Sequence, residues 1–112
     1  METGSFIKTE EFQEGRPKVA LVLETDFTKE IQISMKAGVE MREHQTPYPI
    51  VVHILSGSID FGFEGKTQQM NEGDLITLPG SIPHHLLAKE NSVIRLSLSM
   101  LDTIERVEKA VK

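Results

Sequence analysis

Four histidines are the residues best suited to chemistry in this chain of 112 residues: His44, His53, His84 and His85. An imidazole can bind a transition metal, exchange a proton near neutral pH or hydrogen-bond a ligand. The chain has no cysteine, which excludes a thiol nucleophile, a thiolate metal site and a disulfide. No Gly-x-Ser-x-Gly elbow and no phosphate-binding glycine loop occurs. We therefore expect any chemistry at the histidines.

The segment around the first histidine resembles the first motif of the cupin superfamily. That motif runs glycine, five residues, histidine, one residue, histidine, then a glutamate seven positions before a closing glycine. Gly38, His44 and Gly57 fit it. Thr46 stands at the second histidine position and Ile50 at the glutamate position. The first motif is therefore present in spacing but has lost two of its three metal-binding side chains.

The segment around His84 resembles the second cupin motif. Gly73, Pro79 and His84 fall in register, whereas Ser81 stands at the motif's glycine position and Ala88 at its asparagine position. The resemblance implies an all-β fold, a double-stranded β-helix or jelly-roll barrel of the RmlC-like kind, with a short carboxy-terminal α-helix. One domain covers residues 1–112, with the barrel at about 18–99 and the helix at about 100–111.

The resemblance also implies where a ligand or metal binds. The family's usual site joins three imidazoles and one carboxylate, a set suited to Fe, Mn, Zn, Ni or Cu. In this chain only His44 and His84 occupy metal-ligand positions of the motifs. The cavity therefore either binds a divalent transition metal through these two imidazoles or contains no metal. We predict a small-molecule site lined by His44, Thr46, Tyr48 and His84. No residue is identified as catalytic.

The elements that position these residues have the period of two that is typical of strands. The alternation is clear in Glu30–Lys36, Ser58–Glu64 and Val93–Ser99. Val19–Leu23 is apolar throughout, and Ile50–Leu55 is apolar except at His53. Strands that are apolar on both sides need cover on both sides, which favours a homodimer.

Strand alternation and helical spacing place the remaining side chains. His53 alternates with Val52 and Ile54, and His85 with His84, so both should point away from the barrel interior. Gln45 should likewise point away from His44. Near the carboxyl end, four apolar residues lie on one face of an expected helix: Leu101, Ile104, Val107 and Val111. This face packs either on its own barrel or on a partner subunit. Ser99 is the candidate for the residue that caps the start of the helix.

Composition argues against other classes of partner. The formal net charge is −5 and the basic residues are scattered, which does not suit nucleic-acid binding. No apolar run approaches the roughly 20 residues that span a bilayer, so we expect no membrane association and a cytoplasmic location.

Three functions remain open from the sequence. The first is a binding barrel without essential metal, favoured by the missing histidine and glutamate. The second is a metal-dependent enzyme of the dioxygenase, isomerase or decarboxylase type, which the resemblance permits and the retention of His44 and His84 favours. The third is a structural or regulatory dimer with a vestigial cavity.

Overall fold

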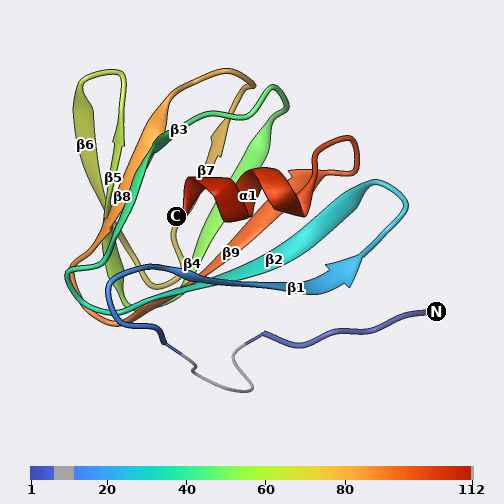
Figure 1. Cartoon of the computed structure of the whole chain (residues 1–112), viewed down its shortest axis with the longest axis horizontal. Coiled ribbons are helices and arrows are strands. Elements are labelled where there is room, and N and C mark those ends of the chain that lie inside the picture. Colours follow the sequence, from blue (N-terminus) through green and yellow to red (C-terminus); the bar gives the residue numbers. More distant parts are fainter. Residues whose placement is uncertain (7–11, 112) are drawn as a thin grey trace.

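Two antiparallel β-sheets face each other and enclose the apolar core, and one short helix lies across the gap between them (Figure 1). The structure is a computed structural model that describes residues 1–6 and 12–111, without the side chains of residues 105 and 106. One sheet has the strand order β1-β2-β9-β4-β7 and the other β3-β8-β5-β6. The elements are β1 (Lys18–Glu24), β2 (Thr28–Met35), β3 (Glu40–His44), β4 (Ile50–Ser56), β5 (Ser58–Phe63), β6 (Lys66–Asn71), β7 (Leu75–Leu78), β8 (His84–Ala88), β9 (Ser92–Ser99) and α1 (Ile104–Ala110).

This architecture confirms the predicted all-β fold with a short carboxy-terminal helix. Strands far apart in the sequence pair directly: β2 pairs with β9, and β9 also pairs with β4. The sheets are antiparallel in every pairing given for them, as short strands joined by turns require.

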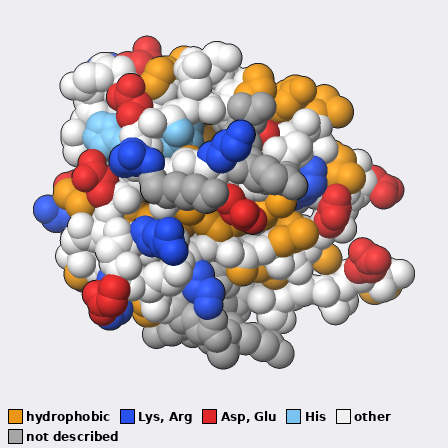
Figure 2. Space-filling model, in the orientation of Figure 1, with side chains coloured by type: hydrophobic (Ala, Val, Ile, Leu, Met, Phe, Trp, Pro, Cys, Tyr) orange, Lys and Arg blue, Asp and Glu red, His pale blue; other side chains and the backbone are white. Residues whose placement is uncertain are grey.

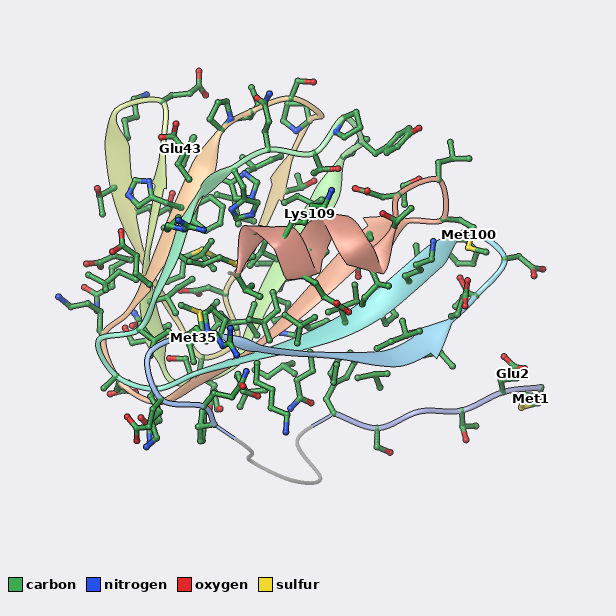
Figure 3. All side chains as sticks on the ribbon, in the orientation of Figure 1. Met1, Glu2, Met35, Glu43, Met100 and Lys109 are labelled. Atoms are coloured by element: carbon green, nitrogen blue, oxygen red, sulfur yellow. The ribbon has the colours of Figure 1, made fainter. Side chains whose placement is uncertain are left out.

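The inner faces of the two sheets supply the core. Ile31, Ile54, Phe61 and Ile94 are fully buried, and the alternation of buried with more exposed residues is clearest in β4, at Ile50–Leu55. This alternation is the period-two pattern of the sequence, now with one face against the opposite sheet. Side chains fill the space between the sheets and beneath α1 (Figure 3).

The end of the chain differs from the sequence expectation. The helix begins at Ile104, later than the expected start near residue 100, because Ser99 and Asp102 close a turn with a backbone hydrogen bond of 3.0 Å. Ser99 does not cap the helix, since its hydroxyl accepts a hydrogen bond from the backbone of Leu101 at 3.1 Å. None of the described helices has the length and apolarity needed to cross a membrane.

The pairing of β3 with β8 positions the histidines. His44 at the end of β3 is the direct partner of His84 at the start of β8. The register between these strands shifts between Met41 and His44, so strict alternation does not hold in this stretch.

Candidate functional site

Two imidazole rings from neighbouring strands form the centre of the site. The rings of His44 and His84 lie 4.2 Å apart between centroids and meet edge to face, with 65° between their planes. The ring of Phe61 of β5 stacks on that of His84 at 5.6 Å between centroids, with 9° between the planes. One phenyl ring and one imidazole therefore pack against His84.

Backbone carbonyls fix the orientation of both rings. The Nδ1 atom of His44 lies 2.7 Å from the carbonyl oxygen of Arg42, and that of His84 lies 2.9 Å from the carbonyl oxygen of Ile82. A carbonyl oxygen only accepts hydrogen bonds, so each Nδ1 carries the proton and donates it. In the neutral ring the Nε2 atom is then an unprotonated acceptor.

Burial keeps both rings neutral at neutral pH. Burial lowers the pKa of His84 to about 4, an effect that its backbone hydrogen bond opposes and the neighbouring His44 reinforces. Burial also lowers the pKa of His44, against the opposing hydrogen bond to Arg42. The charged form of an imidazole is disfavoured in a site that excludes water. The site thus presents two neutral acceptor nitrogens.

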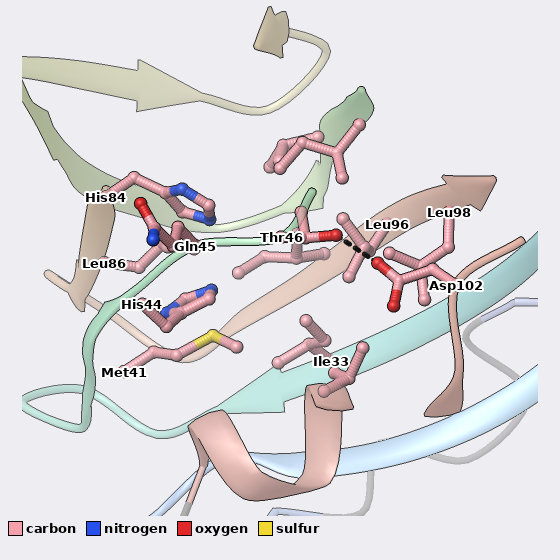
Figure 4. Close-up of a pocket in the computed structure, with 14 residues that line it drawn as sticks. Ile33, Met41, His44, Gln45, Thr46, His84, Leu86, Leu96, Leu98 and Asp102 are labelled. Atoms are coloured by element: carbon pink, nitrogen blue, oxygen red, sulfur yellow. Dashed lines mark hydrogen bonds between the residues drawn. The ribbon is translucent and has the colours of Figure 1, made fainter. Parts of the chain in front are cut away.

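The two imidazoles line a small, mostly apolar cavity inside the barrel (Figure 4). Its volume is about 30 Å³, and nine of its lining residues are apolar: Ile33, Met41, Ile50, Val52, Leu86, Ile94, Leu96, Leu98 and Val107. The polar lining consists of His44, Gln45, Thr46, His84 and Asp102. Outside His44 a second hollow of about 390 Å³ runs along Glu43 and Lys109. Histidine atoms reach the surface on this face, among acidic and basic side chains (Figure 2).

Asp102 is a member of the site that sequence reasoning missed. Its side chain is buried, with 2 % of its surface exposed, and it accepts a hydrogen bond from the hydroxyl of Thr46 (Figure 4). Thr46 therefore directs its hydroxyl at a carboxylate 56 positions away in the sequence. Asp102 stands two positions before the helix, and this position in the sequence gives no sign of the contact.

The described residues do not complete the metal site that the motifs suggest. The fixed Nδ1 atoms leave the Nε2 atoms of His44 and His84 in the state that metal ligation requires. However, Thr46 donates to Asp102, and Ile50 is a buried apolar side chain. Among the described residues, no group of three or more His, Cys, Asp or Glu lies close enough to hold a metal ion.

The other predicted side chains lie at varied distances from the cavity. Tyr48 is half-buried and is not among the residues that line the cavity, and its backbone N–H lies 3.4 Å from the Thr46 hydroxyl. His53 alternates with buried core residues of β4, and His85 lies over Gly62 on the outer face of its sheet. Gln45 was expected to point away from His44 but lines the same cavity, where the alternation of β3 has ended.

Comparison with known proteins supports the fold. Residues 32–101 match the model of the cupin domain family. An RmlC-like cupin protein from Desulfovibrio desulfuricans is 22 % identical, with a TM-score of 0.80 over 88 % of this chain and 96 % of that one. KdgF from Halomonas sp. is 18 % identical, with a TM-score of 0.71 over 90 % and 89 %. The DMSP lyase DddQ from Ruegeria pomeroyi is 24 % identical, with a TM-score of 0.68 over 79 % of this chain and 49 % of that one. No curated protein matches the chain.

The buried imidazoles predict a loss of stability in acid. Because the pKa of His84 falls from 6.5 to about 4 on folding, the unfolded chain binds a proton in this range that the folded chain does not. The free energy of unfolding is therefore unaffected by protonation of His84 above pH 6.5. It falls by about 3 kcal/mol as the pH is lowered from 6.5 to 4. Urea unfolding at pH 7 and at pH 4.5 measures it. His84→Gln should show a smaller difference between the two pH values, and an equal difference would contradict the assignment.

Proposed function

The chain belongs to the cupin domain family, and from this premise we propose that it binds a small molecule in the cavity beside His44 and His84. The observation that carries the proposal is the fixed orientation of both imidazoles, whose Nδ1 atoms donate to backbone carbonyls. Each neutral ring then offers its Nε2 atom as an acceptor in an apolar environment. A ligand group that donates a hydrogen bond to one of these nitrogens is stabilised there, since one such hydrogen bond contributes about 0.5–1.5 kcal/mol.

The polar lining favours one chemical class of ligand. The two Nε2 atoms and the Asp102 carboxylate are acceptors, the Thr46 hydroxyl already donates to Asp102, and the Gln45 amide both donates and accepts. No Lys or Arg is among the residues that line this cavity, so a carboxylate or phosphate ligand would meet no opposite charge. The preferred ligand is an apolar molecule with an alcohol or amine group.

Replacing both histidines tests the binding proposal. His44→Ala with His84→Ala removes two acceptors and should weaken binding of a donor-bearing ligand by ten- to a hundredfold, or about 1–3 kcal/mol. Saturation-transfer NMR with small apolar alcohols, amines and shape-matched carboxylates identifies such a ligand and gives its affinity.

The control for this test is His53→Ala, which removes an imidazole from outside the cavity and should leave binding unchanged. Circular dichroism checks that each variant is folded. If the double variant unfolds, His44 and His84 are structural. Equal binding by the double variant and the unchanged protein, or a preference for carboxylates, would contradict the proposal.

The alternative is a metal-dependent enzyme that uses His44 and His84. The name of one similar structure, the DMSP lyase DddQ, is that of an enzyme and favours this alternative. Against it stands the ligand set, in which Ile50 and the engaged Thr46 replace two of the family's ligands. Two imidazoles alone hold a divalent ion weakly, because no adjacent carboxylate offsets its charge.

We predict that the protein purified without a histidine tag or chelator carries no stoichiometric transition metal. Inductively coupled plasma mass spectrometry of Fe, Mn, Zn, Ni and Cu per chain measures this. His84→Ala is the matched variant, since it removes one of the two remaining imidazoles. Near-stoichiometric metal that disappears in His84→Ala would move the enzyme alternative ahead of the binding barrel.

The outer face of β4 supports a homodimer, whether or not the cavity binds a ligand. Val51, His53 and Leu55 on this face are half-buried, and the neighbouring Leu75 of β7 is 60 % exposed. An exposed apolar side chain beside half-buried apolar ones is typical of a surface that a second subunit covers. A structural or regulatory dimer would use the same face.

A charge at the exposed apolar position should separate the subunits. Leu75→Glu places a carboxylate in the proposed interface and should shift the mass in sedimentation equilibrium from dimer to monomer. Phe27→Glu is the control, because Phe27 is also highly exposed, at 74 %, but lies in the turn between β1 and β2. A monomeric unchanged protein at about 100 µM would refute the dimer.

A further inference from the structure

The carboxy-terminal helix closes the cavity that the proposed ligand would occupy. Helix α1 packs on β3 and β1, across the gap between the two sheets (Figure 1). Val107 on α1 is only 6 % exposed, belongs to the barrel core and lines the cavity together with the two imidazoles. The space left beside them, about 30 Å³, has room for one or two water molecules. A larger ligand therefore needs space that α1 now fills.

Polar contacts hold the segment before α1 in place. The Asp102 carboxylate accepts hydrogen bonds from the Thr46 hydroxyl and from the backbone N–H of Thr103, the latter at 2.8 Å. The Lys29 ammonium donates to the carbonyl oxygens of Met100 at 3.1 Å and of Asp102 at 2.5 Å. Of these contacts, only the Thr46–Asp102 hydrogen bond lies inside the cavity lining. This hydrogen bond joins the segment before α1 to the loop that follows His44.

Helix α1 depends on this docking for its own structure. It has seven residues, whereas isolated helices shorter than about 12–15 residues are marginal in water. Ala110 and Val111 at its last turn are partly buried against the core, and surface hollows of about 390 and 590 Å³ lie beside them. The strands that line the cavity are instead held by backbone hydrogen bonds to their neighbours. Undocking of α1 is therefore the least costly way to enlarge the cavity.

We propose that α1 occupies part of the ligand site, and that the Thr46–Asp102 hydrogen bond controls when the helix leaves it. With α1 undocked, the apolar body of a ligand takes the place of Val107, and its alcohol or amine group faces the Nε2 atoms of His44 and His84. The ligand's identity rests on the proposed function above. The opening of the helix does not, and it can be measured without any ligand.

The accessibility of His84 reports the opening. Diethyl pyrocarbonate acylates neutral imidazoles, and peptide mass spectrometry at pH 7 gives the rate for each histidine. In the unchanged protein His84, which is 3 % exposed, should react much more slowly than the half-buried His85 outside the barrel. Thr46→Val removes the hydrogen bond to Asp102. We expect His84 to react about tenfold faster in this variant, the equivalent of about 1.4 kcal/mol in the opening equilibrium.

Three controls separate helix opening from general loosening. Thr46→Ser keeps the hydroxyl and should restore the slow rate. Thr77→Val makes the same kind of change on the outer face of β7, where the Thr77 hydroxyl donates to the carbonyl of Ile50 at 2.8 Å, and should leave His84 slow. The rate at His85 should stay constant in every variant.

A second variant, Val107→Ala, weakens the packing of α1 on the barrel and so tests the same opening of the helix. It replaces Thr46→Val if that variant does not fold. It should also speed the reaction at His84. The proposal is overturned if His84 reacts as fast as His85 in the unchanged protein, or if neither substitution speeds its reaction. The variants could react faster at His84 while the protein binds no ligand that carries an alcohol or amine group. That result would overturn the proposed function and support the opening of the helix.

Discussion

The pairing of β3 with β8 is the interaction on which the site depends. It sets His44 beside His84 across two strands that are separated in the sequence by β4 to β7. His84 then lies buried and His44 partly buried beside it, their Nδ1 atoms reach backbone carbonyls, and Phe61 covers one face of His84. Burial, orientation and the lowered pKa of these imidazoles all follow from this one pairing.

The same cavity contains an internal hydrogen bond at a position where the family motif has a metal-binding side chain. At the position where the family motif has a second histidine, Thr46 supplies a short side chain whose hydroxyl reaches Asp102 and not the imidazoles. The carboxylate of the cavity thus comes from the segment before α1, while the strand position of the motif's glutamate holds Ile50. A carboxylate at that position of β4 would be a candidate metal ligand, whereas Asp102 ties the end of the chain to the barrel.

Much of the fold could be predicted because its signals are local. Gly57, which closes the first motif, adopts a φ of 90°, and a Cβ there would lie 2.3 Å from the Ser92 hydroxyl oxygen. In the second motif Gly80 stands one position before Ser81, which occupies the motif's glycine position, and this displacement also has a physical reason. Gly80 approaches the carbonyl of Pro47 so closely that a Cβ would lie 2.1 Å from its oxygen, and Ser81 takes the positive φ of 66°. His44 and His84 could be identified for the same reason, through spacing.

The parts that could not be predicted depend on contacts between distant segments. Nothing near Asp102 in the sequence indicates Thr46 as its partner. The pairing of β3 shifts register just before Gln45, which lines the cavity, and no residue type in this stretch predicts that shift. These same residues are the ones that no strand ladder holds. Gln45 and Thr46 follow the end of β3, and Asp102 and Val107 follow the end of β9. The side of the cavity that the sequence failed to predict is therefore also the side that tertiary contacts alone keep closed, and local opening concentrates in such segments.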